Sequence, residues 1–230
     1  MTFKEELEKF ATDTFGRAWT ITDGRKIPTA DSAVGLGNVG VKLDATVLYA
    51  DLADSTGLVR RFKRQYAAEV YKTFVYSAAR CIRYHGGEVT AYDGDRVMGV
   101  FIGAGMESAA VRASFRLKGI VDEVLKPISS KRWTGEQKLD HKCGIDKSEL
   151  WVANTGIRGN TDYVWVGNAA NNAAKMAALG ATYKTYVTEQ VHVALDANIR
   201  VSAAGSPFFH RVANTGLDYT ILGSNAFISS

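Results

Sequence analysis

Apolar and polar residues alternate along this chain in short segments that polar turns separate. An apolar run at residues 45–51 predicts a buried strand, which ends in the polar turn 53–56. Apolar side chains then recur at helical spacing over residues 58–84, and the helix is expected to stop at the glycine pair 86–87. The pattern therefore predicts a strand followed directly by a long helix.

The rest of the chain predicts a hairpin, further helices and several short strands. The hairpin turns at Asp93-Gly94, a pair that favours a tight turn. The other predicted elements are an amphipathic helix at 1–18, an irregular lead-in at 22–40, helices at 106–125, 167–180 and 189–196, a polar loop at 127–138, a strand–turn–strand block at 139–156, and strands at 162–166, 184–188, 208–212 and 218–222. This order predicts an α+β fold of the ferredoxin-like kind, with an antiparallel-rich sheet and the long helices on one face.

Composition gives no sign of two independent domains. The chain has 230 residues, 3 prolines and no low-complexity stretch, so we expect an N-terminal extension, 1–44, and one domain, 45–230. The two cysteines form no disulfide framework. The first residues include acids and no apolar core of a signal peptide, and no apolar run is long enough for a membrane span. We therefore expect a cytoplasmic protein with no membrane partner.

The net charge of +4 is mild, and it is locally concentrated at residues 60–64, Arg-Arg-Phe-Lys-Arg. This cluster is either a solvated helix face or a positive funnel that steers a triphosphate toward the preceding turn. Aromatic residues do not interleave with a basic stripe, so no nucleic-acid partner is expected.

Two acidic residues lie where predicted strands end. Asp51 closes the apolar strand, and Asp95 follows the turn of the hairpin. In a ferredoxin-like sheet the first strand and the hairpin are neighbours, so the two carboxylates can approach each other. Carboxylates held close repel each other unless cations lie between them, and hard divalent cations prefer oxygen ligands. The pair predicts a site for two metal ions, Mg²⁺ or Mn²⁺, although either residue alone could simply cap a turn.

The turn after the strand leads directly into the next predicted helix. Free backbone N–H groups between Leu52 and Thr56 could therefore hold a phosphate, while Ser55 and Thr56 could equally serve as plain helix N-caps. Leu52 is assigned to the predicted metal site, and the predicted substrate-binding residues of this turn are Ala53, Asp54, Ser55 and Thr56.

Three polar residues share one face of the predicted helix at 167–180. Asn168, Asn171 and Lys175 are spaced three and four residues apart, and the other faces are nearly all alanine. Alanine lets this helix pack closely on its neighbour and leaves a polar strip with an amide and a cation. An asparagine and a lysine at this spacing are also common on exposed helices.

Three motifs in this order resemble those of class III nucleotide cyclases, over about residues 44–222. VLYADLADST resembles their metal strand and phosphate loop, and YDGDRVMGVF resembles their second metal motif, a Gly-Asp at a hairpin turn. GNAANNAAKM resembles their helix motif Gly-(Asp/Asn)-x-x-Asn-x-x-x-Arg, with Lys175 in place of the arginine. CGIDKSELWVANTG is similar to their Gly-Ile-His-x-Gly strand pair, with Asp146 and Ser148 as departures.

The resemblance implies a role for each matching residue. Asp51 and Asp95 would bind two Mg²⁺ or Mn²⁺ ions, and Asn171 would orient the ribose. Lys175 would offset charge that grows on the α-phosphate, without the bidentate fork of an arginine. In this family the active site is shared across a dimer, so the resemblance implies a homodimer in which one subunit supplies the aspartates and the other supplies Asn171 and Lys175.

The base-reading positions of the family depart from its purine cyclases. Ala91 and Val164 stand where those enzymes carry polar residues, so the usual hydrogen bonds to a purine edge cannot form. Tyr49 lies two residues before Asp51, hence on the same strand face. Its phenol could enter the base pocket and favour a smaller base, or it could be a core aromatic.

YDGDRVM in a cyclase domain without a sensor resembles the pyrimidine cyclases of bacterial anti-phage (Pycsar) systems. The resemblance implies a nucleoside triphosphate substrate, UTP in preference to CTP, and a cyclic UMP or cyclic CMP product that activates a separately encoded effector protein. No histidine falls beside the motifs, so we expect a metal-bound 3′-hydroxyl to attack without a side-chain base. An adenylate or guanylate cyclase of bacterial signalling and a non-catalytic nucleotide-binding module are the alternatives.

Overall fold

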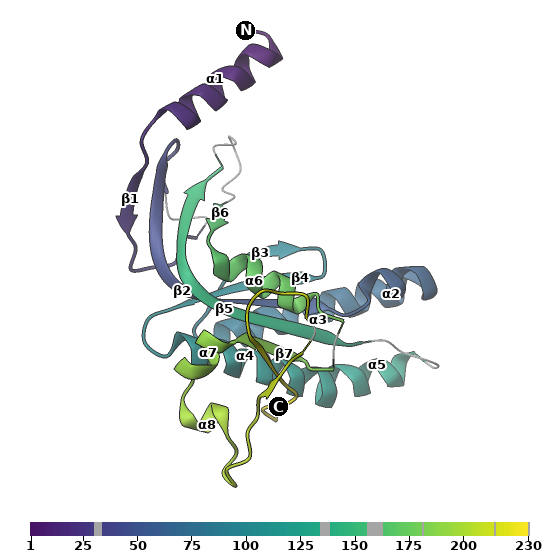
Figure 1. Cartoon of the computed structure of the whole chain (residues 1–230). Helices are drawn as coiled ribbons and strands as arrows, with labels where there is room; N and C mark the ends of the chain where they lie inside the picture. Colours follow the sequence, from purple (N-terminus) through teal and green to yellow (C-terminus); the bar gives the residue numbers. More distant parts are fainter. Residues whose placement is uncertain (30–33, 134–138, 156–162, 181, 214, 230) are drawn as a thin grey trace.

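The computed structural model of the chain describes residues 1–29, 34–133, 139–155, 163–180, 182–213 and 215–229 (Figure 1). The strands are β1 (Thr20–Asp23), β2 (Val39–Leu52), β3 (Glu88–Asp93), β4 (Arg96–Ile102), β5 (His141–Asn154), β6 (Tyr163–Val166), β7 (Thr185–Thr188), β8 (His210–Arg211) and β9 (Ile221–Ser224). The helices are α1 (Phe3–Gly16), α2 (Ser55–Arg61), α3 (Arg64–Tyr84), α4 (Met106–Ile120), α5 (Lys126–Arg132), α6 (Asn168–Ala177), α7 (Glu189–Ala194) and α8 (Ala197–Arg200), and a π-type turn (Val121–Leu125) joins α4 to α5.

In the described part of the chain, nine strands form one sheet. Its order is β3-β4-β2-β5-β7-β9-β8, with β1 added beside β2 and β6 beside β5. The pairs β1–β2 and β5–β7 are parallel, and the others are antiparallel. The predicted α+β fold with a largely antiparallel sheet is therefore confirmed.

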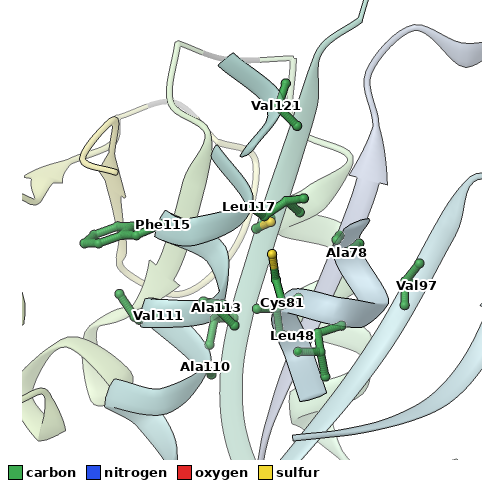
Figure 2. Packing of buried hydrophobic residues seen from close by; sticks show 14 of the residues in the cluster. Leu48, Ala78, Cys81, Val97, Ala110, Val111, Ala113, Phe115, Leu117 and Val121 are labelled. Carbon is green, nitrogen blue, oxygen red and sulfur yellow. The ribbon is translucent and has the colours of Figure 1, made fainter. Parts of the chain in front are cut away.

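The long helices α3 and α4 lie on one face of this sheet, as the sequence pattern predicted, and the shorter helix α6 covers the other face. Successive side chains of β2 point to opposite faces, so the strand is buried on both. Leu48 and Ala50 pack with α3 and α4 in one apolar cluster (Figure 2), whereas Ala45 and Val47 pack with α6 in another. The small alanines of α6 explain the second layer, because they let a helix lie close against the strands.

The block at 139–156 is one long strand rather than two strands around a turn. β5 pairs continuously with β2, from Leu52 opposite His141 to Gly40 opposite Ala153. Gly144, inside this strand, allows a close approach: a side chain there would collide with the backbone of α6 and come within 2.8 Å of Met176 Cβ. The glycine therefore belongs to a helix–sheet contact.

The prediction of a polar loop at 127–138 is wrong for its first half. The chain stays helical from α4 through the π-type turn into α5, although none of the α5 residues is buried. Asp122 supports this run because it accepts hydrogen bonds from Lys118 (2.7 Å) and Lys126 (2.5 Å), one turn away on either side. Residues 134–138 of the predicted loop lie outside the described residues.

The helix predicted at 58–84 is divided into α2 and α3. Phe62 and Lys63 between them are extended, and the Phe62 ring packs against Tyr66 with 5.2 Å between ring centroids. This aromatic contact draws Phe62 toward the core and interrupts the helix.

The N-terminal segment is more regular than the predicted lead-in. β2 begins at Val39, six residues before the predicted start, and β1 pairs with its first residues. The boundary predicted after residue 44 therefore falls inside β2. Helix α1 starts with a capping box between Thr2 and Glu5, buries none of its residues and projects away from the sheet (Figure 1). No helix among the described residues has the length and apolarity that a membrane crossing requires.

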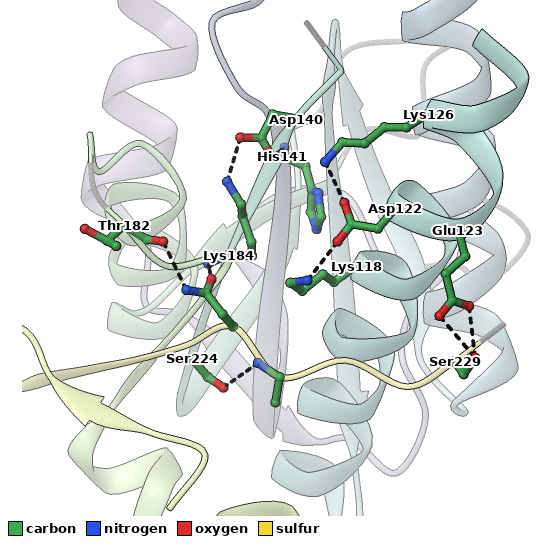
Figure 3. A network of polar contacts seen from close by, with 12 residues as sticks. Lys118, Asp122, Glu123, Lys126, Asp140, His141, Thr182, Lys184, Ser224 and Ser229 are labelled. Carbon is green, nitrogen blue, oxygen red and sulfur yellow. Dashed lines mark hydrogen bonds and ion pairs between the residues drawn. The ribbon is translucent and has the colours of Figure 1, made fainter. Parts of the chain in front are cut away.

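His141 is a buried polar residue in this fold. It is 1% exposed, and neither ring nitrogen has a hydrogen-bond partner among the described residues. Figure 3 shows the ring beside the Asp140–Lys184 ion pair, with Asp122 and Lys126 on its other side. Burial lowers the pKa of His141 to about 4, because an imidazolium would lose its hydration, while the four surrounding charges act in opposite directions.

We expect acid to destabilise the protein through His141. Its folded pKa of about 4 lies below the ordinary value of 6.5, so protonation favours the unfolded chain. The stabilisation is complete above pH 6.5 and is lost as the pH falls toward 4, about 2 kcal/mol being lost by pH 5. Urea unfolding at pH 7.5 and pH 5 should show a smaller loss in His141→Leu than in wild type. His210→Leu, at an exposed histidine, should behave like wild type; equal losses in all three proteins would contradict this prediction.

Candidate active site

Two aspartates meet at one edge of the sheet, where β2 ends beside the β3–β4 hairpin. Asp51 is the second-last residue of β2 and lies directly opposite Arg96 at the start of β4. Asp95 precedes Arg96 in the hairpin turn, which Gly94 makes with a φ of +61°. The predicted approach of strand end and hairpin is therefore present in the fold.

The electrostatics of Asp51 reflect this approach. The pKa of Asp51 is raised to about 6, chiefly by burial and next by the negative charge of Asp95. Arg96 and Lys142, the residues opposite Asp51 on the two neighbouring strands, lower the pKa in part. Charge on Asp51 is thus disfavoured until a cation compensates for it.

The donor set fits a hard divalent cation. No group of three or more His, Cys, Asp or Glu residues able to hold a metal occurs in the described ranges. The edge therefore offers two carboxylates, Asp51 and Asp95, and the main chain of Leu52, whose side chain is only 2% exposed. Magnesium commonly takes one or two protein carboxylates and completes its coordination with water and substrate phosphates. The two aspartates match that pattern.

The turn that follows Asp51 has several of its polar groups in use. The Ala53 N–H donates to the Asp140 carbonyl at 2.8 Å. Asp54 has a positive φ of 54° and forms an ion pair with Arg61 at the end of α2. The Ser55 carbonyl accepts a hydrogen bond from the Tyr71 hydroxyl at 3.3 Å, and Thr56 is exposed in the first turn of α2. The turn is held by its own contacts next to the aspartates.

Tyr49 and Ala91 lie in one row beside the aspartates. Both are directly opposite Met98 on β4, so the three side chains share the sheet face that carries α6. Tyr49 and Ala91 are half-buried, and burial raises the pKa of the Tyr49 hydroxyl. The sequence analysis did not include Met98 in this row. Its position two residues after Arg96 could have indicated it, because side chains two apart on a strand share a face.

The polar face of α6 borders a separate cavity. Asn168, Asn172 and Lys175 line a space of about 550 Å³ together with residues of the β7–α7 junction and residues 218–220. Asn171 and Lys175 are exposed, and Lys175 has no ion-pair partner in the part of the chain that the structure describes. Neither Asp51 nor Asp95 lines this cavity. This cavity, as the described residues form it, therefore contains one half of the predicted site and not the other.

Val164 is also remote from the other base-reading position. It pairs with Ala153 near the far end of β5, whereas Tyr49 pairs with Gly144 of the same strand. Ala153 and Gly144 are nine residues apart on β5, which is roughly 30 Å along the strand. Val164 is 47% exposed there. Within one chain it cannot line the same pocket as Tyr49.

Relatives share most of this chain, although no protein-family model matches it. A uridylate cyclase from Xanthomonas perforans is 45% identical over 226 residues, which cover 98% of this chain and 97% of the relative. Uridylate cyclases from Burkholderia cepacia and Rhodovulum sp. (strain MB263) are 40% and 35% identical, and the matches cover 84% and 74% of those proteins. The chain belongs to the uridylate cyclase family. It is therefore a nucleotide cyclase, as its motifs predicted.

Solved structures place this uridylate cyclase family member among class III cyclase folds. The guanylyl cyclase Cya2 superposes with a TM-score of 0.67 at 21% identity, covering 83% of this chain and 95% of that one. The adenylyl cyclase CyaB from P. aeruginosa gives a TM-score of 0.67 at 16% identity, covering 83% and 96%. At this identity the likeness establishes the fold, and the predicted class III catalytic-domain fold is confirmed.

One polar residue beside the candidate site was missed by the sequence pattern. Asn172 follows Asn171 but turns toward β5, where its side-chain amide donates to the buried carboxylate of Asp146 at 2.8 Å. The helix motif assigns roles to Asn171 and Lys175, and it assigns none to Asn172. Asp146 could have indicated this contact. It stands where the strand motif of the family has a histidine, and a buried carboxylate needs a hydrogen-bond donor.

Proposed function

We propose that this chain converts UTP to 3′,5′-cyclic UMP and pyrophosphate. The observation that carries the proposal is the 45% identity to a uridylate cyclase along nearly the whole chain. The row formed by Tyr49, Met98 and Ala91 supports a pyrimidine substrate. It offers a tyrosine ring and apolar surface where a purine cyclase needs paired polar groups for a base edge. CTP is the alternative pyrimidine.

The two aspartates hold the metal ions in this proposal. Asp51, Asp95 and the Leu52 main chain would bind two Mg²⁺ or Mn²⁺ ions, which when bound lower the pKa of the ribose 3′-hydroxyl and neutralise the departing phosphates. The raised pKa of Asp51 supports this assignment, since a cation removes the repulsion between the carboxylates. Residues 53–56, at the start of α2, lie where they can contact the triphosphate.

The proposed reaction breaks one P–O bond and forms another. The 3′-oxygen attacks the α-phosphorus, its proton passes to solvent, and the bond to pyrophosphate breaks in line with the attack. Asn171 orients the ribose, and the ammonium of Lys175 offsets the charge that develops on the α-phosphate oxygens. No side chain serves as the base.

A homodimer completes the site. Asn171 and Lys175 are exposed on α6, and Lys175 borders a cavity that neither aspartate lines, which supports their acting on the substrate of a second subunit. Val164, too far along β5 to reach Tyr49 in its own chain, is likewise assigned to the partner's base pocket. Each dimer then has two equivalent sites.

The proposal extends to the fate of the product. The resemblance to the Pycsar cyclases supports cyclic UMP as a messenger that activates a separately encoded effector in anti-phage defence. Nothing in this role requires a nucleic acid or a membrane at the cyclase itself.

Product identification tests the substrate assignment. Purified protein is incubated separately with ATP, GTP, CTP and UTP in the presence of Mn²⁺, and the products are identified by mass spectrometry. We expect cyclic UMP as the dominant product, with at least about tenfold less cyclic CMP and still less of the purine products, because one missing set of base contacts costs at least 1.4 kcal/mol. Cyclic AMP or cyclic GMP as the main product would overturn the pyrimidine assignment and leave a purine cyclase.

A further inference from the structure

Alternate residues of one strand hold the helix that carries Asn171 and Lys175. Positions 142, 144, 146 and 148 of β5 share one sheet face, and each of them contacts α6 or its ends. From the C-terminal to the N-terminal end of the helix, the contacts are Lys142 Nζ to the Leu179 carbonyl, Gly144 against the Ala173 backbone, Asp146 Oδ2 to Asn172 Nδ2 and Ser148 Oγ to the Ala169 N–H. The strand therefore fixes α6 along its length.

Asp146 is the charged centre of this face. It is fully buried, and its two oxygens have different partners. Oδ2 accepts the Asn172 amide at 2.8 Å, whereas Oδ1 accepts the Thr188 hydroxyl at 2.6 Å and the Gln190 amide at 2.7 Å. The neighbouring cation, Lys147, is bound to Glu107 instead, at 2.6 Å. A buried carboxylate requires such donors, and here one of them comes from α6.

The bond to Asn172 sets the rotation of α6 about its own axis. Asn172 lies between Asn171 and Lys175, and in an α-helix each residue advances about 100° around the axis. Fixing Asn172 on Asp146 therefore fixes the direction in which the two neighbours project. The other contacts of α6 with β5 are made by its backbone, and the side chains it buries are alanines and Met176, so Asn172 supplies the side-chain hydrogen bond of α6 to Asp146.

We propose that Asp146 is a positioning residue that acts through Asn172 to orient Lys175 and Asn171 toward the reacting triphosphate. The inference rests on the proposed function for the role of Lys175, but not for the anchoring of α6. It also accounts for one departure from the family's strand motif: the aspartate in place of the histidine accepts the donor that Asn172 supplies.

The test exchanges the two partners. Asn172→Asp places two carboxylates together and should lower kcat about a hundredfold while KM for UTP changes less than about threefold. The double variant Asp146→Asn with Asn172→Asp restores a donor–acceptor pair. The new amide at position 146 donates its N–H to the carboxylate at position 172, and its oxygen remains to accept from Thr188 and Gln190. It should recover kcat to within about fivefold of wild type. Failure of the folded double variant to recover would overturn the proposal.

Two controls separate positioning from general stability. Ser114→Ala breaks a buried hydrogen bond of 2.6 Å to Thr185 away from α6, and it should leave kcat within about twofold of wild type. In a Lys175→Ala background, Asn172→Asp should cost at least about threefold less than in wild type, because Asn171 is then the one group left to be positioned. An equal loss with and without Lys175 would overturn the proposal.

Hydrogen exchange decides the inference if the protein cyclises none of the four nucleotides. That outcome removes the proposed function but not the anchoring of α6. Amides of residues 168–177 should exchange at least about tenfold faster in Asn172→Asp and should recover protection in the double variant. Where Asn172→Asp does not fold, Asn172→Ala takes its place. Unchanged exchange in a folded single variant would overturn the inference.

Discussion

Asp51→Asn is expected to lower turnover of UTP by at least about a thousandfold, equivalent to about 4 kcal/mol of lost transition-state stabilisation. The amide keeps the shape of the carboxylate but removes the charge that would hold the metal ions against Asp95. Stability should not fall, because the raised pKa of Asp51 indicates that its charge is disfavoured in the folded protein. Turnover with Mn²⁺ and a thermal unfolding curve measure both effects.

The matched control is Asp44→Asn on the same strand. Asp44 is exposed and lies opposite Glu149, far from the hairpin turn. It should retain the turnover of wild type, and Asp95→Asn should behave like Asp51→Asn. Wild-type activity in either variant of the aspartate pair, with the fold intact, would remove the metal assignment.

Mixed dimers should regain activity that neither parent variant has. Asp51→Asn and Lys175→Ala homodimers each carry two defective sites if the site is shared between subunits. In a mixed dimer one site combines the intact Asp51 of one chain with the intact Lys175 of the other. Random pairing makes half of the dimers mixed, so about one quarter of the wild-type sites return. Co-expression and a turnover assay of the purified mixture measure this recovery.

The control pairs two variants from the same half of the site. Mixing Asp51→Asn with Asp95→Asn should restore nothing, because both aspartates of a site come from one chain and each mixed dimer has a defect in both sites. No recovery in the first mixture, despite proven mixed dimers, would mean that each chain builds its site alone. Recovery in the control would mean that the two aspartates of a site come from different chains, and it would also overturn the assignment.

The elements around the aspartates could be predicted because local patterns determine them. Asp51 was expected near the hairpin for two local reasons. It ends an apolar strand, and the tight Asp93-Gly94 turn is followed by another strand. The same holds for α6, since its alanine face and its asparagine–lysine spacing are both local. Membership in a cyclase family followed from three motifs in order.

The missing parts depend on contacts between distant segments. β5 runs unbroken through the turn predicted within 139–156, and Gly144 lies inside this strand, where it makes room for α6. Asp146 and Ser148 are polar residues of the same strand, and their partners are Asn172 and the start of α6. None of these partners is visible in a local window of sequence. The helical course into α5 did have a local signal, because Lys118 and Lys126 lie one turn on either side of Asp122.

Gly144 also bears on any redesign of base preference. It lies directly opposite Tyr49, so a close helix–sheet contact adjoins the proposed base pocket. A library that varies Ala91 changes the pocket from the hairpin side and leaves the helix untouched. Any mutation that adds bulk at position 144 would displace α6. Base selectivity could then change only together with the position of Lys175 on that helix.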